Sequence, residues 1–135
     1  MLYNLLDVST SALVAQRTRL NVIAANIASQ KAILNANGEY EPYRRRFAVF
    51  APGDPARGTA DGVHVASIEV DRGPLRPVYE PGSPFADADG YVSYPNVDPV
   101  IEMMNAMEAA RSYEANITAI EATKSMITAA LQILA

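Results

Sequence analysis

The chain has 135 residues, with eleven lysines and arginines against fifteen aspartates and glutamates, and a formal net charge of −4. This acidic balance gives no electrostatic support for binding a nucleic-acid backbone or an anionic membrane surface. The lack of cysteine excludes disulfides, thiolate metal sites and cysteine nucleophiles. The length fits one domain, and neither an apolar run of about 18 residues nor a secretory signal is recognisable, so we expect no membrane span and no export by the general secretory route.

Residues 2–29 predict a long amphipathic helix, because they contain no glycine or proline and repeat apolar residues at heptad spacing. One row consists of Leu6, Leu13, Leu20 and Ile27, and a second row contains Ile23 with the polar residues Ser9 and Gln16. The two polar residues leave two interpretations open. They fix the register of helix pairing at some cost in stability, or they face a gap or solvent. Further apolar residues lie outside both rows, so one antiparallel partner does not cover the whole apolar surface.

Residues 30–97 differ sharply in composition from both flanks, because they hold all seven glycines, all prolines except Pro99 and most of the aromatic residues. Alternating apolar residues predict strands at 43–51 and 63–71, and a short edge strand at 75–80. Asn37-Gly38 predicts a turn, and the glycine- and proline-rich residues 51–62 are predicted as a loop. We therefore expect a β-rich insert of three strands, which is too small to be stable without support from the helices.

Residues 98–135 predict the longest element of the chain. Asp98 is placed to cap the helix, Pro99 fits its first turn, and no glycine ends it. At ~1.5 Å per residue this helix is ~55 Å long. Its predicted packing seam, at steps of three and four, is formed by Met103, Ala106, Ala110, Tyr113, Ile117, Ile120, Lys124, Ile127, Leu131 and Leu134.

The end of this helix, residues 126–135, is apolar in every direction and carries neither a polar cap nor a glycine stop. Burial by other subunits explains this composition most economically. A two-helix hairpin with exposed apolar ends is the alternative interpretation.

The expected fold is mainly α with a small β insert. Residues 1–29 and 98–135 form one discontinuous, coiled-coil-like helical domain, and residues 30–97 form the β-rich insert with its loops. We expect the seam of the C-terminal helix to face Leu6, Leu13, Leu20, Ile23 and Ile27, within one chain, between chains, or both.

No pattern in the sequence argues for an enzyme, a cofactor or a metal. His64 is the single histidine, between two valines on a predicted strand, with no nucleophile elbow or second histidine to partner it. Residues 85–91 resemble the start of a calcium loop but lack a third acidic ligand and the glutamate at the twelfth position. We expect a turn whose aspartates bond local backbone amides. The basic run 44–46 is interpreted as a solvated strand face or a salt-bridge strip between subunits.

Several stretches of the chain, in order and over nearly its whole length, resemble the bacterial flagellar basal-body rod proteins. The motifs Asn26-Ile27-Ala28 and Tyr113-Glu114-Ala115-Asn116 are shared across rod, hook and related axial proteins, and residues 90–98 are typical of the C type of the proximal rod. One departure from the family pattern is Ser29, where axial proteins usually have asparagine and a short turn. This difference leaves the conformation of residues 29–39 open.

The resemblance implies a structural subunit of a helical rod that transmits torque from motor to hook, with the terminal helices in an inner layer and the β region outside. It implies partners among other copies, other rod proteins, the membrane-ring adapter and the export apparatus, and no nucleic acid or small-molecule substrate. It also implies a place in the periplasm and type III flagellar export without a cleaved signal. The alternative is a soluble coiled-coil adapter or export chaperone that binds amphipathic helices. A cell-wall hydrolase would need paired carboxylates in a cleft, whereas the carboxylates here are scattered.

Overall fold

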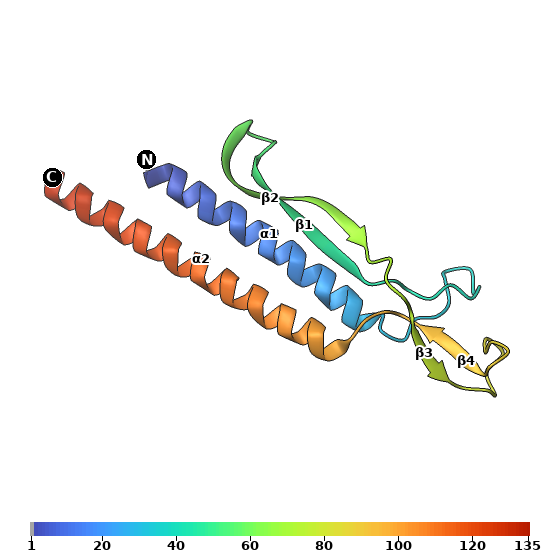
Figure 1. Cartoon of the computed structure of the whole chain (residues 1–135). Helices are drawn as coiled ribbons and strands as arrows, with labels where there is room; N and C mark the ends of the chain where they lie inside the picture. The colour runs from blue at the N-terminus through green and yellow to red at the C-terminus, as the bar shows by residue number, and fades with distance from the viewer. Residues whose placement is uncertain (1) are drawn as a thin grey trace.

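The computed structural model describes residues 2–135, with side chains from Tyr3 onward, so Met1 of the predicted helical segment lies outside the described residues. Helix α1 spans Leu2–Ala28 and helix α2 spans Pro99–Leu134. They run antiparallel, and a small β region connects them (Figure 1). The predicted pair of long terminal helices with a β-rich middle is therefore confirmed. Within residues 2–135, neither helix is long and apolar enough to cross a membrane.

Helix α2 begins as predicted at Asp98. The Asp98 Oδ1 accepts hydrogen bonds from the backbone N–H of Val100 at 2.9 Å and of Ile101 at 3.5 Å, and Pro99 occupies the first turn. With 36 residues α2 is ~54 Å long, and α1 with 27 residues is ~40 Å long. The C-terminal end of α2 therefore extends past the N-terminal end of α1 (Figure 1).

Burial along α2 follows two rows at seven-residue spacing. The inner row consists of Glu102, Ala109 and Thr123, which are buried, and Asn116, which is half-buried; the second row consists of the half-buried Ala106, Tyr113, Ile120 and Ile127. Among the described helices and strands only α1 packs on α2, so these rows mark the side that α1 covers. The inner row lies one position before Met103, Ala110, Ile117 and Lys124 of the predicted seam. The inner row thus presents small and polar side chains to α1, the second row adds larger apolar ones, and Met103 and Ile117 remain exposed.

Helix α1 lies between α2 and a β-hairpin, and its buried residues include Ala15, Val22 and Ile23. On the sheet side, the backbone N–H of Val63 donates to the Ser11 hydroxyl at 3.1 Å. Gly62 permits this approach, since a Cβ atom there would lie 2.7 Å from the Ser11 Oγ. Ser9 is buried, so the interpretation that it faces solvent is wrong.

The β region consists of two separate antiparallel pairs. Strands β1, Arg46–Asp54, and β2, Thr59–Val70, form one pair; strands β3, Arg76–Tyr79, and β4, Tyr91–Tyr94, form the other. The predicted loop at 51–62 is wrong, because strand pairing continues to Asp54 and resumes at Thr59. A register irregularity with Gly53 at φ +88° carries β1 past Pro52. Strand β4 was not predicted, because only four residues pair and they follow a turn-rich loop.

Two turn predictions are confirmed. Gly38 adopts φ +80° in a small hairpin closed by the Leu34–Tyr40 bridge, which defines the conformation of residues 29–39. In the loop that resembles a calcium site, the Asp87 Oδ1 accepts from the N–H of Asp89 at 3.0 Å and of Tyr91 at 2.9 Å. This aspartate therefore stabilises its own turn.

His64 belongs to the β1–β2 hairpin. Its side chain is half-buried, and its Nδ1 lies 2.8 Å from the Gly53 carbonyl oxygen. The contact ties the ring to the irregular part of β1.

Candidate functional site

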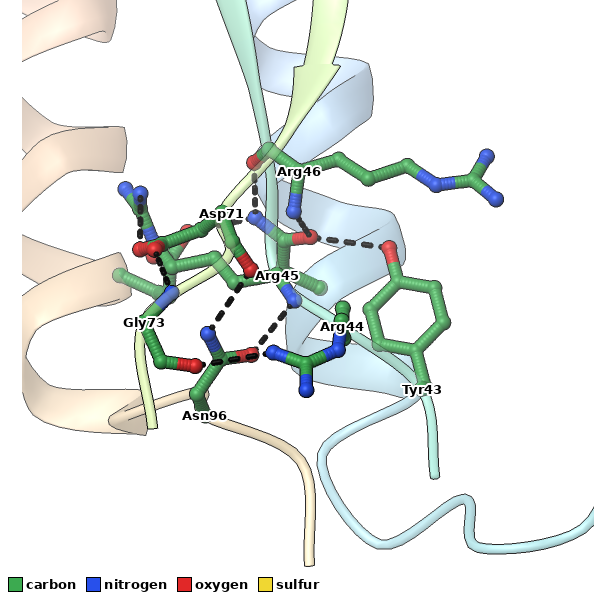
Figure 2. A network of polar contacts seen from close by, with 9 residues as sticks. Tyr43, Arg44, Arg45, Arg46, Asp71, Gly73 and Asn96 are labelled. Atoms are coloured by element: carbon green, nitrogen blue, oxygen red, sulfur yellow. Dashed lines mark hydrogen bonds and ion pairs between the residues drawn. The ribbon is translucent and has the colours of Figure 1, made fainter. Parts of the chain in front are cut away.

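A polar cluster joins the end of α1, the start of β1 and the start of α2 (Figure 2). We call it the junction clamp. Its members come from segments far apart in the sequence and are Asn26, Tyr43, Arg45, Asp71, Asn96 and Glu102.

Glu102 is the fully buried charge at the centre of the junction clamp. The Arg45 Nε donates to its Oε1, and the Asn26 Nδ2 donates to its Oε2 at 3.2 Å. A buried carboxylate is tolerated only when it is paired and hydrogen-bonded. Its position in the first turn of α2 adds a favourable interaction with the helix dipole.

Asn26 links the last turns of α1 to the first residue of β1. Its Oδ1 accepts from the Arg46 N–H at 3.0 Å, and its Nδ2 donates to the Arg46 carbonyl at 2.7 Å. The Tyr43 hydroxyl donates to the same Oδ1 at 2.9 Å. The amide therefore pairs with both backbone groups of Arg46, as a neighbouring strand would, and this covers the outer edge of β1 at its beginning.

Arg45 connects β1 to the segment before α2. Its N–H donates to the Asn96 Oδ1 at 2.8 Å, and its carbonyl accepts from the Asp71 N–H at 2.8 Å. The Asn96 Nδ2 donates to the Asp71 carbonyl at 3.2 Å, which closes the ring of contacts. The Arg45 Nη1 also lies 3.8 Å from the Asp71 Oδ2.

The other two arginines of the basic run differ in what their side chains contact. The Arg44 Nη1 donates to the Gly73 carbonyl at 2.9 Å, whereas the Arg46 guanidinium points away from the cluster and lies 5.7 Å from the Tyr43 ring centroid (Figure 2). The interpretation of this run as a solvated strand face is therefore wrong for Arg44 and Arg45. These side chains bind groups of their own chain.

Burial raises the pKa of the Tyr43 hydroxyl above its usual 10.0; the positive charge of Arg46 opposes this shift, and the negative charge of Glu102 adds to it. A raised pKa in the folded state means that the stabilisation is fully present below pH 10 and is lost as the pH rises through the folded pKa.

We expect Tyr43→Phe to lower the free energy of unfolding by about 1 kcal/mol at neutral pH, because the hydrogen bond to Asn26 is lost. The difference from the wild type is expected to stay constant up to pH 10 and to narrow above it. Urea unfolding followed by circular dichroism from pH 7 to pH 11 measures both effects. A difference that widens above pH 10 would contradict the assignment.

The junction clamp has a structural rather than a reactive arrangement. Its carboxylates and amides are occupied by one another, and no three metal-binding side chains among residues 2–135 come together to hold an ion. What the cluster fixes is the direction in which the strands leave the helical pair.

The structure places the predicted packing residues in three groups. On α1, Ile23 is buried and Leu6, Leu13, Leu20 and Ile27 are half-buried. On α2, the half-buried ones are Ala110, Tyr113, Ile120 and Ile127, and the exposed ones are Met103, Ile117, Leu131 and Leu134. The exposed group stays largely uncovered in the single chain, and its packing against other chains stays a prediction.

Of the two family motifs, only the first enters the junction clamp. Ile27 and Ala28 follow Asn26 at the end of α1, the former half-buried and the latter exposed. In the second motif, the Asn116 Nδ2 donates to the Ser112 carbonyl at 2.8 Å within its own helix, next to the half-buried Tyr113.

The remaining motif residues, Glu114 and Ala115, are exposed. Sequence reasoning missed Glu102, and it named Arg45 only as part of the basic run 44–46, without its partner in the same chain. The sequence feature that could have identified Glu102 is its position seven residues before Ala109, in the same heptad row, which the structure buries.

A second candidate surface is an apolar flank on the first turns of α2. It is formed by Val100, Ile101, Met103, Met104 and Met107, all of them exposed. We call it the methionine flank. Contiguous exposed apolar residues of this kind mark interaction sites, and methionine adapts well to a partner surface.

Comparison with known proteins agrees with this architecture. The family model "Flagellar basal body rod FlgEFG protein C-terminal" matches residues 88–133, which include nearly all of α2, and "Flagella basal body rod protein" matches residues 6–29, which include most of α1. The flagellar basal-body rod protein FlgC of Salmonella typhimurium is 49% identical, with 93% of this chain and 92% of the relative covered. The FlgC proteins of Bacillus subtilis, at 39% identity and 97% coverage of both chains, and of Buchnera aphidicola subsp. Acyrthosiphon pisum, at 38% identity and 98% and 97% coverage, are also similar. With such identity over nearly the whole length, this chain belongs to the FlgC family of flagellar basal-body rod proteins and is a structural subunit of the rod.

Proposed function

We propose that this chain assembles helically with copies of itself and with other rod proteins to form the drive shaft that carries torque from motor to hook. The observation that carries the proposal is the apolar surface that a single chain leaves uncovered on α2. The side chains of Met103, Leu131 and Leu134 are 60%, 62% and 84% exposed. Covering them with neighbouring subunits would supply hydrophobic free energy for assembly.

In this proposal residues 1–29 and 98–135 act as one discontinuous helical domain with coiled-coil-like packing, and residues 30–97 form an outer β-rich insert. The seven-residue repeat of buried positions on α2 supports such packing. Small residues at Ala106 and Ala109 let α1 approach closely, while the larger apolar residues remain available to other subunits.

The junction clamp gives the subunit the stiffness that torque transmission requires. The β1–β2 hairpin also packs directly on α1, and the clamp adds a second attachment where the chain passes from the helices to the strands. The hydrogen bonds of Asn26 and the buried pair of Arg45 with Glu102 fix this joint. When the helical pair rotates, the β region would then rotate with it as one rigid body.

The proposal includes the membrane-ring adapter and the export apparatus as further partners and a periplasmic position. It also includes export by the type III flagellar apparatus, and no catalytic activity. The relatives bear the name of rod proteins, and the junction clamp offers no reactive group.

The test is to isolate basal bodies from the bacterium that produces this chain, and from a strain lacking it. Electron microscopy of the wild-type particle is expected to show the chain in a tube with its terminal helices innermost. The deletion strain is expected to be non-motile. A motile deletion strain, or basal bodies without this chain, would overturn the proposal.

A further inference from the structure

A cleft of about 360 Å³ lies between the helical pair and the outer edge of β1. Val22 and Ile23 of α1 and Phe47 and Phe50 of β1 give it apolar walls. Three arginines and one asparagine add polar groups, and these are Arg19, Arg45, Arg46 and Asn105. An apolar cleft with a few cationic groups at its edge is suited to an aromatic side chain that is accompanied by a carboxylate.

Two of these arginines are already paired within the chain. Arg45 is bound to Glu102, and the Arg19 Nη2 lies 3.3 Å from the Glu108 Oε2. Arg46 is exposed, and among residues 2–135 no carboxylate lies within ion-pair distance of it. The guanidinium of Arg46 lies 5.7 Å from the Tyr43 ring centroid, and it is the one arginine of the cleft lining that is free to bind an external carboxylate.

The outer edge of β1 also has backbone N–H and C=O groups that can form hydrogen bonds with a partner. Both backbone groups of Arg46 point away from β2, to Asn26. Since these directions alternate along a strand, the N–H and C=O of Ala48 point the same way, toward the cleft. Asn26 covers the edge at Arg46, and Pro52 has no N–H to offer, so the available edge is short.

The hairpin of β3 and β4 carries a complementary feature. Tyr79 and Tyr91 are 64% and 43% exposed and pack edge to face with ring centroids 5.3 Å apart. Gly90 makes this possible, because a Cβ atom there would lie 3.0 Å from the Tyr79 ring. Asp89, exposed at the preceding turn, adds a carboxylate. This hairpin projects beyond the end of the helical pair, opposite the two termini (Figure 1).

We propose that the Tyr79–Tyr91 pair of one copy inserts into the cleft beside β1 of a second copy, with Asp89 paired to Arg46. Aromatic side chains and arginines are the residues that contribute most to interface energy, and the charges of the two surfaces are complementary. The proposal rests on the proposed function and names one of its contacts. Because the two surfaces differ, a pair of copies in contact still has one free cleft and one free hairpin. A contact of this kind propagates into an open helical array and does not close into a dimer.

The chain contains no cysteine, which allows a direct proximity test. Arg46→Cys and Asp89→Cys are combined in the full chain, and isolated basal bodies are treated with a short bismaleimide. We expect a crosslinked dimer and higher multimers of this subunit. The matched control combines Arg72→Cys with Asp61→Cys, two exposed residues outside the cleft and the hairpin, and is expected to stay monomeric on the gel.

A charge exchange tests the same contact without crosslinking. Arg46→Glu and Asp89→Arg, each alone, are expected to reduce the amount of subunit in basal bodies, by roughly tenfold if the pair is worth about 1.4 kcal/mol. The double variant is expected to restore it. Subunit present in basal bodies without a crosslink, or a double variant as poor as the singles, overturns this contact and leaves the proposed function standing. Absence of the wild-type chain from basal bodies overturns the proposed function itself.

Discussion

Arg45→Met is expected to lower the free energy of unfolding by about 3–5 kcal/mol, because it leaves the fully buried carboxylate of Glu102 without its cation. Methionine fills a similar volume, so the loss reflects charge rather than packing. Typical domains have only about 5–15 kcal/mol of stability, so this variant should be largely unfolded under mild denaturing conditions. Urea unfolding at neutral pH, followed by circular dichroism, measures the loss.

Three further variants separate the buried pair from other effects. Arg44→Met removes one hydrogen bond to the Gly73 carbonyl and is expected to cost about 1 kcal/mol, and Arg72→Met, at an exposed position, less than about 0.5 kcal/mol. Adding Glu102→Gln to Arg45→Met neutralises the unpaired charge and is expected to regain much of the lost stability. If Arg45→Met were no worse than Arg44→Met, the role of the junction clamp would be refuted.

Leu131→Glu is expected to abolish assembly into rods and motility while leaving the β region folded. Leu131 is 62% exposed in the part of α2 that extends beyond α1, so the single chain loses little when it changes. In the assembled rod, the same substitution would place a charge in an apolar contact without a partner, at a cost of several kcal/mol. Motility assays and the content of this subunit in isolated basal bodies report the effect.

The matched control for this prediction is Gln132→Glu, which introduces the same charge at the next residue, on another side of the helix. It is expected to assemble and to support motility. Circular dichroism of both purified variants checks that the helices and strands are retained. Normal incorporation of Leu131→Glu would show that the end of α2 is not buried by neighbouring subunits.

The sequence by itself determined the two terminal helices, the capping of α2 at Asp98 and the β-rich character of the middle. These features depend on local signals: heptad spacing, an N-cap with a following proline, and a sharp change in glycine and proline content. The turns at Gly38 and Asp87 were equally local, and the structure has them as expected. The motif containing Asn26 indicated the family, although not what this side chain does.

Only the tertiary structure decided which side of α2 faces α1, and how the strands are joined to the helices. Hydrophobicity selected two rows on α2. The structure half-buries the row that contains Tyr113, Ile120 and Ile127. It leaves Met103, Ile117 and Leu131 of the other row exposed, and buries the row one position earlier, which contains Ala109 and Thr123. Close helix packing favours small side chains, and a subunit of an assembly keeps exposed apolar residues for its neighbours, so hydrophobicity alone misplaces one of the two rows. The junction clamp could not be predicted, because Asn26, Arg45 and Glu102 meet only after the chain has folded, and burying a charged residue is acceptable only when its partners are in place.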